Sequence, residues 1–277
     1  MALLANGGMT MIKRLEACAA AFVQESALNH VTIETTGREI RLFDEPLMGF
    51  ASAQDALFDE YLRPGVIGPH YRKPEEWLTG AKTVLSFFLP FTEEVRAANR
   101  AQQAEPGQEW LYGRIEGQRF VFALCEALRQ ELEHMGFAAV TPSASEAFWT
   151  VSEPDENGLS YTSNWSERHA AYACGLGTFG LSKGLITEKG MAGRFGSLVT
   201  AAEIAPTPRA YTQVYEYCIR CGKCIQRCPG HAITLENGKD HHQCLQYQKT
   251  IMPRLLPRFG CGLCQTDVPC EHTKPLG

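Results

Sequence analysis

The stretch CIRCGKCIQRCPG, residues 218–230, restricts what this chain can fold into more than any other feature. It places Cys218, Cys221, Cys224 and Cys228 in the spacing C-x2-C-x2-C-x3-C-P. A cubane 4Fe–4S cluster needs thiolates that converge from several directions, and three closely spaced cysteines on a curling loop supply three of them. Zinc, the alternative metal, favours pairs of C-x2-C separated by a spacer, which this triplet does not match. The spacing therefore predicts iron–sulfur chemistry.

A second, less regular set of cysteines follows: Cys244, Cys261, Cys264 and Cys270. In two-cluster modules the cysteine before the proline serves the other cluster, which predicts a crossed assignment. One cluster would be held by Cys218, Cys221, Cys224 and Cys270, and the other by Cys228, Cys244, Cys261 and Cys264. The segment AITLENGKD between the two sets is typical of a short hairpin with an Asn-Gly turn. The alternative is that a cysteine of the second set, first of all Cys270, is a buried spectator.

The remaining three of the eleven cysteines, Cys18, Cys125 and Cys174, are scattered and are expected to be core thiols. Disulfides are rare in a reducing cytosol, so a dense local group of cysteines there more often binds metal. No apolar run is long enough to span a membrane, and the N-terminus lacks the charged region of a secretory signal. We therefore predict a cytoplasmic protein with no membrane partner.

The pattern along the chain predicts a large mixed unit followed by a small one. Apolar spacing indicates helices over residues 9–28 and 117–136 and from Ser166 onward, with strands over 83–90, 137–142 and 196–204 and a hairpin over 31–43. The mixture indicates an α/β or α+β fold for residues 1–207. The segment APTPRA, 205–210, reads as a linker, and residues 208–277 carry an excess of Lys and Arg over Asp and Glu. Two domains are expected, 1–207 and 208–277.

The segment CGLGTFG, 174–180, contains the glycine spacing G-x-G-x-x-G of a dinucleotide-binding turn. Such a turn needs a strand before it and a helix after it, because the helix N-terminus faces the pyrophosphate. Here a predicted helix precedes Gly175, which suits a left-handed helix stop. The order favours a helix stop and a tight turn, with nicotinamide binding as the alternative.

Several segments together resemble the epoxyqueuosine reductase family and, more distantly, reductive dehalogenases. They are KPEEWLTGAKTVLSFFLPF at 73–91, SERHAAYACGLGTFGLSKGLITEKGMAGRFGSLVTAAEI at 166–204, the motif at 218–230 and CLQYQ at 244–248. The resemblance covers about residues 70 to 270. It implies an α/β, nitroreductase-like, cobalamin-binding domain over 1–207, followed by a ferredoxin-like α+β domain with two 4Fe–4S clusters over 208–277. It also implies that the glycines at 175–180 let the backbone approach a corrin ring.

The resemblance also implies site residues. Leu185, Ser197 and Ala201 fall at or near positions of family corrin contacts. The family's catalytic acid falls on Tyr161, whose hydroxyl is protonated at neutral pH and can donate a proton. Arg114 lies in a block like the family's G-R-D-Y-H and is expected beside Tyr161 in the cofactor site. No D-x-H-x-x-G stretch is present, so cobalamin is expected base-off with no histidine on cobalt; DHHQC at 240–244 lacks the glycine, and its histidines are expected to be solvated.

The predicted function is a cobalamin-dependent reductase fed by two 4Fe–4S clusters, acting on an unnamed substrate. A low-potential donor such as ferredoxin or flavodoxin is the expected electron source, and transfer RNA is one partner that the resemblance allows. The chain departs from the family in its second cysteine motif, where the loop from Cys264 to Cys270 is two residues longer. Two alternatives stay open: a non-catalytic electron carrier that reduces the corrinoid of another protein, and a flavin-dependent reductase.

Overall fold

The computed structural model describes residues 10–156 and 158–276 and is built on a four-stranded sheet. The strand order is β3 (Leu47–Ser52), β4 (Thr83–Pro90), β10 (Gly193–Thr200) and β5 (Ala139–Val140), and every neighbouring pair is antiparallel. All residues of β4 are buried, as its continuous apolar run predicts. The mixed character of the first unit is confirmed, but antiparallel pairing makes it α+β and corrects the α/β prediction.

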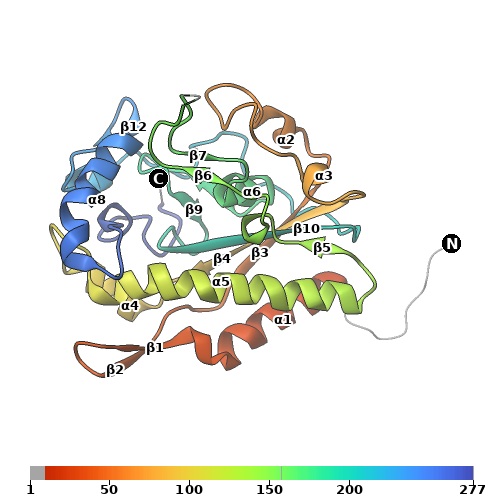
Figure 1. The fold of residues 1–277 in the computed structure, drawn as a ribbon, viewed down its shortest axis with the longest axis horizontal. Helices are drawn as coiled ribbons and strands as arrows, with labels where there is room; N and C mark the ends of the chain where they lie inside the picture. The colour runs from red at the N-terminus through yellow and green to blue at the C-terminus, as the bar shows by residue number, and fades with distance from the viewer. Residues whose placement is uncertain (1–9, 157, 277) are drawn as a thin grey trace.

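Helices cover both faces of this sheet (Figure 1). The long helix α5 (Gln108–His134) lies along one face with α1 (Met11–Glu25) packed beneath it, and α6 (Glu167–Ala173) lies on the other face. The helix predicted over 117–136 begins nine residues earlier, at Gln108. Gly113 and Gly117 resemble helix breakers in the sequence, but they make room for Phe91 and Phe43, whose rings a Cβ atom would meet at 2.6 and 2.8 Å.

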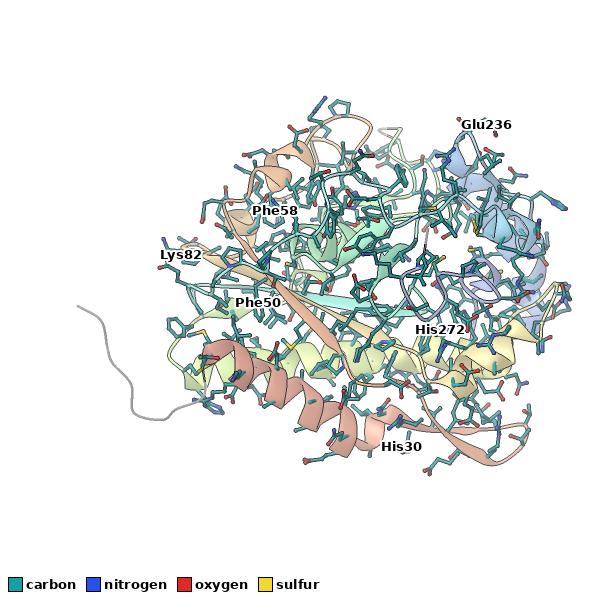
Figure 2. All side chains as sticks on the ribbon, turned by 180° about the vertical axis from the view of Figure 1, so that it is seen from behind. His30, Phe50, Phe58, Lys82, Glu236 and His272 are labelled. Carbon is teal, nitrogen blue, oxygen red and sulfur yellow. The ribbon has the colours of Figure 1, made fainter. Side chains whose placement is uncertain are left out.

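Shorter elements complete the first unit. The hairpin predicted over 31–43 is confirmed as β1 (His30–Ile33) and β2 (Arg38–Arg41). Figure 2 shows the fold from behind, with Phe50 on β3 and Phe58 on α2 (Ala56–Glu60). The other elements are α3 (Pro74–Trp77), α4 (Glu93–Arg100), β6 (Thr150–Val151) and β7 (Thr162–Ser163). Within the described residues, no helix is both long and apolar enough to cross a bilayer.

The glycine segment forms a helix stop and a hairpin. The amide of Gly175 (φ +82°) donates to the Tyr172 carbonyl and the amide of Leu176 donates to the Ala171 carbonyl, which is a Schellman motif closing α6. The strands β8 (Gly177–Phe179) and β9 (Leu185–Thr187) follow, so the dinucleotide-turn alternative is wrong. A Cβ on Gly177 would meet the Ile186 carbonyl oxygen at 1.9 Å. This glycine therefore serves the approach of two strands, and the approach of the 175–180 backbone to a corrin ring stays a prediction.

Replacing Gly177 by alanine is expected to lower the free energy of unfolding by about 1–3 kcal/mol, because the new methyl group must displace backbone. Gly180→Ala is the matched control, since its nearest contact is the flexible end of Ile186 at 3.2 Å, and it should cost about 1 kcal/mol or less. Thermal unfolding of the anaerobic proteins measures both. Equal stability of the two variants would contradict the close-approach role of Gly177.

The cysteine-rich C-terminal part packs directly against the first unit. Its elements are α7 (Lys223–Gln226), the hairpin of β11 (Ile233–Thr234) and β12 (Gly238–Lys239), and α8 (His241–Leu255). The buried Glu271 accepts from Arg100 and lies 3.5 Å from Arg96, both on α4. The predicted linker is anchored as well, because Thr207 exchanges hydrogen bonds with Phe50 of β3. The boundary between domains at 207 and 208 stays a prediction.

Candidate functional site

Eight cysteines gather around two separate pockets. The outer cysteine set lines one pocket and consists of Cys218, Cys221, Cys224 and Cys270. The inner cysteine set lines the other and consists of Cys228, Cys244, Cys261 and Cys264. This is the grouping of the crossed assignment. Among the described residues no three Cys, His, Asp or Glu side chains form a site for a single ion; each set of four surrounds a pocket instead.

Residues in left-handed backbone conformation turn the chain so that the cysteines of each set face the same pocket. Arg220 (φ +51°) and Gly222 (φ +74°) curl the chain through the outer set, and α7 then carries Cys228 away toward the inner set. The longer loop before Cys270 is held by Thr266, which is fully buried. Its carbonyl accepts from Arg227 at 3.1 Å and its hydroxyl accepts from Asn99 at 3.0 Å. The two extra residues of this loop therefore still bring Cys270 to the outer set.

The environment of the sulfur atoms fits iron–sulfur clusters. Burial, together with neighbouring thiols, raises the pKa of Cys224, Cys261 and Cys270 to about 12, so these thiols need bound cations to ionise. Donors already point at inner-set sulfurs: Lys239 Nζ lies 3.3 Å from Cys264 Sγ and Gln248 Nε2 lies 3.4 Å from Cys244 Sγ. Hydrogen bonds to cluster sulfurs of this kind stabilise the charge on thiolates.

The two sets differ in their exposure. Cys221 of the outer set is exposed, and the exposed Ile219 lies beside it in the same pocket. In the inner set Cys228 and Cys264 are buried. Cys224 of the outer set is buried as well, so the exposed Cys221 is what makes the outer set the more accessible of the two.

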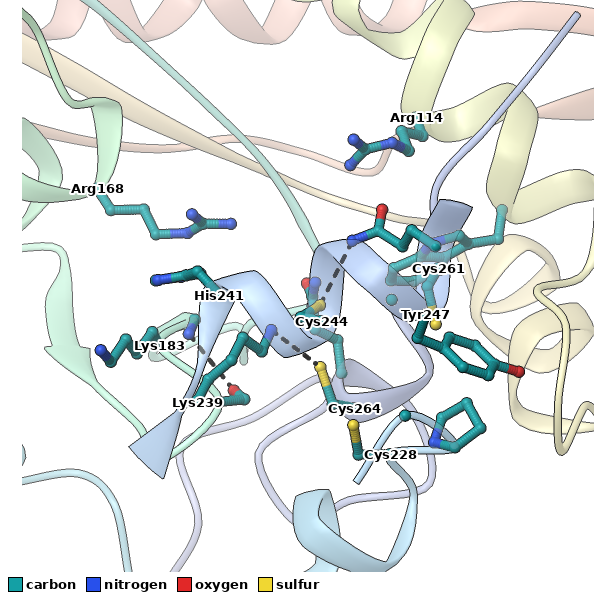
Figure 3. Close-up of a pocket in the computed structure, with 18 of the residues that line it drawn as sticks. Arg114, Arg168, Lys183, Cys228, Lys239, His241, Cys244, Tyr247, Cys261 and Cys264 are labelled. Carbon is teal, nitrogen blue, oxygen red and sulfur yellow. Dashed lines mark hydrogen bonds between the residues drawn. The ribbon is translucent and has the colours of Figure 1, made fainter. Parts of the chain in front are cut away.

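The inner set lies at the bottom of a cavity of about 130 Å³, which adjoins a larger cavity of about 600 Å³. Four side chains line both and form the shared wall: Tyr161, Arg168, Lys183 and His241. In Figure 3 the guanidinium groups of Arg114 and Arg168 point toward each other above Cys244. The shared wall therefore separates the inner cysteine set from a space large enough for much of a bulky cofactor or substrate.

Tyr161 is fixed at this wall by unusual local geometry. It has left-handed backbone (φ +49°), its side chain is 40% exposed, and its ring stacks on His241 with centroids 4.2 Å apart. Arg114 and Arg168 both lie close enough to Tyr161 for their charges to interact with it. The structure thus brings the predicted pair of Tyr161 and Arg114 together. The catalytic role of Tyr161 stays a prediction.

The other three predicted cofactor contacts do not reach either cavity. Leu185 is fully buried within the apolar cluster behind β8 and β9, and Ala201 is half-buried beyond the end of β10. Ser197 is also fully buried, and its hydroxyl bonds Trp165 Nε1 at 2.9 Å and Glu167 at 2.6 Å. Burial raises the pKa of Glu167 to about 7. The contact of these three residues with a corrin stays a prediction.

Several residues of the cavities were missed by sequence reasoning. His241 was expected to be solvated, but it is half-buried against Tyr161. Burial and the nearby cations lower its pKa to about 4, so it is neutral at pH 7. Arg168 stands next to Glu167 in a segment that the resemblance covers, yet nothing in that segment shows that Arg168 meets Arg114 and Arg194 across the fold. Only the tertiary structure brings these arginines together.

Comparison with known proteins identifies one sequence feature and one fold. Residues 211–234 match the model of the 4Fe–4S binding domain family, which supports the iron–sulfur prediction. A search of curated proteins gave no match.

Solved structures with a similar fold include epoxyqueuosine reductases and reductive dehalogenases. An epoxyqueuosine reductase aligns with 85% of this chain and 64% of its own, at 17% identity and a TM-score of 0.50. A second, solved with an epoxyqueuosine-modified stem loop of tyrosine tRNA, covers 83% of this chain and 63% of its own, at 18% identity and a TM-score of 0.52. A catabolic reductive dehalogenase solved with 3-bromo-4-hydroxybenzoic acid covers 83% of this chain and 30% of its own, at 14% identity and a TM-score of 0.54.

These matches confirm the resemblance at the level of the fold. The chain spans less than two thirds of the length of the epoxyqueuosine reductases and less than a third of the dehalogenase.

Proposed function

We propose that this chain, which has the fold of epoxyqueuosine reductases and reductive dehalogenases, is a corrinoid-dependent reductase with two 4Fe–4S clusters. One observation carries the proposal: the inner cysteine set and the large cavity share a wall that contains Tyr161. Electrons delivered to the inner set would need to cross only this wall to reach a cofactor in the cavity.

The two cysteine sets would hold the clusters in the crossed arrangement. We expect a low-potential ferredoxin or flavodoxin to donate electrons at the outer cluster, and the exposure of Cys221 supports this expectation. Lys239 and Gln248 would donate hydrogen bonds to the thiolates of the inner cluster. Such donors raise the potential of a cluster, because they favour the form with more negative charge.

The larger cavity would hold the corrinoid. Its lining includes the apolar side chains of Val66, Ile67, Phe179 and Val214 and the polar side chains of the shared wall, a mixture that suits a large amphipathic macrocycle. When bound, the corrinoid supplies a metal centre that takes up electrons and reduces the substrate. Tyr161 holds a proton on its hydroxyl at the edge of this cavity, and the guanidinium groups of Arg114 and Arg168 stabilise the phenolate left after transfer.

The test of this function is cofactor selection. Protein reconstituted anaerobically with iron and sulfide and offered cobalamin and flavin together is expected to retain cobalamin with its lower base displaced. The sequence lacks a D-x-H-x-x-G motif, so electron paramagnetic resonance of the cobaltous form should show no nitrogen superhyperfine splitting from an axial ligand. Splitting from an axial nitrogen would contradict the base-off state without a histidine ligand, and tight flavin binding without corrinoid would favour the flavin-reductase alternative.

A second measurement separates an enzyme from an electron carrier. A carrier that reduces the corrinoid of another protein should bind no corrinoid of its own and should reduce an added corrinoid protein. We expect the opposite, because the large cavity lies inside this chain beside the inner cysteine set.

A further inference from the structure

Cationic side chains gather in the two cavities without acidic partners. The smaller cavity is lined by Arg114, Arg168, Lys183, Arg194 and Lys239, and Arg168 and Lys183 line the larger one as well. No Asp or Glu is among the described residues that line either cavity. Arg168 is exposed and the other four side chains are half-buried. Their crowding, rather than burial, favours a bound anion, because like charges held close together repel one another.

The arginines are close enough to repel one another. Burial, together with the charges of Arg114 and Arg168, lowers the pKa of Arg194 to about 9, although the charge of Glu167 acts in the opposite direction. The Nε atom of Arg194 is buried with no hydrogen-bond partner among the described residues. Arg114 donates only to the Phe259 carbonyl, and neither Arg168 nor Lys183 makes a side-chain hydrogen bond or ion pair with any described residue. Arg194 also donates to Gln118 and interacts with the charge of Glu167. Arg114 and Arg168 are therefore the two guanidinium groups that no acidic side chain among the described residues pairs with.

The inner cluster accounts for only part of this charge. A cubane held by four thiolates carries a net charge of about −2 or −3, depending on its oxidation state. Lys239 already donates to Cys264 Sγ, whereas the three arginines and Lys183 donate to none of the inner-set sulfurs. Of the five positive charges in the smaller cavity, two or three therefore remain without a counter-charge. Arg168 and Lys183 are the pair that also faces the larger cavity.

We propose that Arg168 and Lys183 bind an anionic group, a carboxylate or a phosphate, of the substrate at the wall shared by the two cavities. That the ligand is a substrate rests on the proposed function, whereas the anion site rests on the geometry alone. A guanidinium binds carboxylate or phosphate through two parallel hydrogen bonds, and an ammonium adds a point charge. An anion held there would be fixed next to the Tyr161 hydroxyl, so the same contact would select acidic substrates and orient them toward the proton donor.

Equilibrium dialysis with labelled inorganic phosphate tests the site on the cluster-loaded protein, with and without cobalamin. We expect saturable binding to about one site per chain at low salt. Arg168→Met should weaken it about tenfold or more, since a hydrogen bond to a charged group contributes about 1.5–3 kcal/mol. Arg168→Lys should recover part of the loss. Arg63→Met, which removes an exposed arginine paired with Glu60, is the matched control and should leave binding unchanged.

Competition identifies the source of the anion. Benzoate should displace phosphate while its neutral analogue benzamide should not, which supports a small acidic substrate. Stronger displacement by an RNA stem loop than by benzoate supports the same site with a nucleic-acid phosphate as its ligand.

Two results would overturn the proposal. The first is phosphate binding that is absent or is unchanged by Arg168→Met, in protein with a normal iron content. The second is an Arg168→Met variant that loses affinity for cobalamin but not for cobinamide. Cobinamide lacks the nucleotide phosphate of cobalamin, so this result would mean that Arg168 binds the cofactor rather than the substrate. If the protein binds no corrinoid but still binds phosphate through Arg168, the proposed function is wrong and the anion site is supported.

Discussion

Anaerobically purified protein is expected to contain about eight irons and about eight sulfides per chain, from two cubanes of four irons each. Removing two ligands of one cluster should abolish that cluster alone. Because the structure places Cys228 and Cys264 around the same pocket, the double variant Cys228→Ala/Cys264→Ala should retain about four irons in one intact cubane. Reduction of substrate should fall to background, since the inner cluster is the step next to the large cavity.

A second double variant separates the crossed assignment from a sequential one. Cys218→Ala/Cys228→Ala removes the first and the last cysteine of one sequence motif, which is one ligand from each pocket. The crossed arrangement predicts damage to both clusters, and no intact cubane signal should remain in electron paramagnetic resonance. A sequential arrangement predicts one intact cubane instead. Cys18→Ala is the control, because Cys18 packs against the core of the first unit, and it should keep about eight irons.

The sequence predicted the local parts of this molecule well. The strand over 83–90 has the predicted bounds because its apolar run is buried on both faces, and Gly175 ends α6 because only its left-handed φ closes the turn. The cysteine spacing also predicted which thiols share a pocket, including Cys270 across a longer loop. In each case the information lies within a few residues or in a spacing that the chemistry of clusters restricts.

The sequence could not predict contacts that join distant segments. The pairing direction of the sheet depends on how β4 and β10 meet, about 100 residues apart, and periodicity carries no information about direction. The meeting of Arg114, Arg168 and Arg194 depends on α5, α6 and β10 lying around one cavity. The resemblance assigned Leu185 and Ser197 as corrin contacts by position; both side chains are buried in the core, and the assignment stays a prediction.

Tyr161→Phe is expected to lower turnover by about 10²-fold or more, the usual contribution of a general acid, while iron content and corrinoid affinity stay unchanged. The substitution removes one hydroxyl and keeps the ring that stacks on His241, so the shared wall should keep its shape. The loss should arise in proton delivery, because phenylalanine has no hydroxyl to give up a proton. Without that hydroxyl no phenolate forms for Arg114 and Arg168 to stabilise. Single-turnover kinetics in H2O and D2O, compared with the rate of cluster reduction, would place the defect after electron entry.

Tyr215→Phe is the matched control, because Tyr215 lines the same large cavity, is similarly exposed and is absent from the shared wall. It should change turnover by about twofold or less. Full activity in Tyr161→Phe would show that another group supplies the proton. The search would then turn to Lys183, the other side chain of the shared wall that carries a transferable proton at pH 7, since His241 is neutral there.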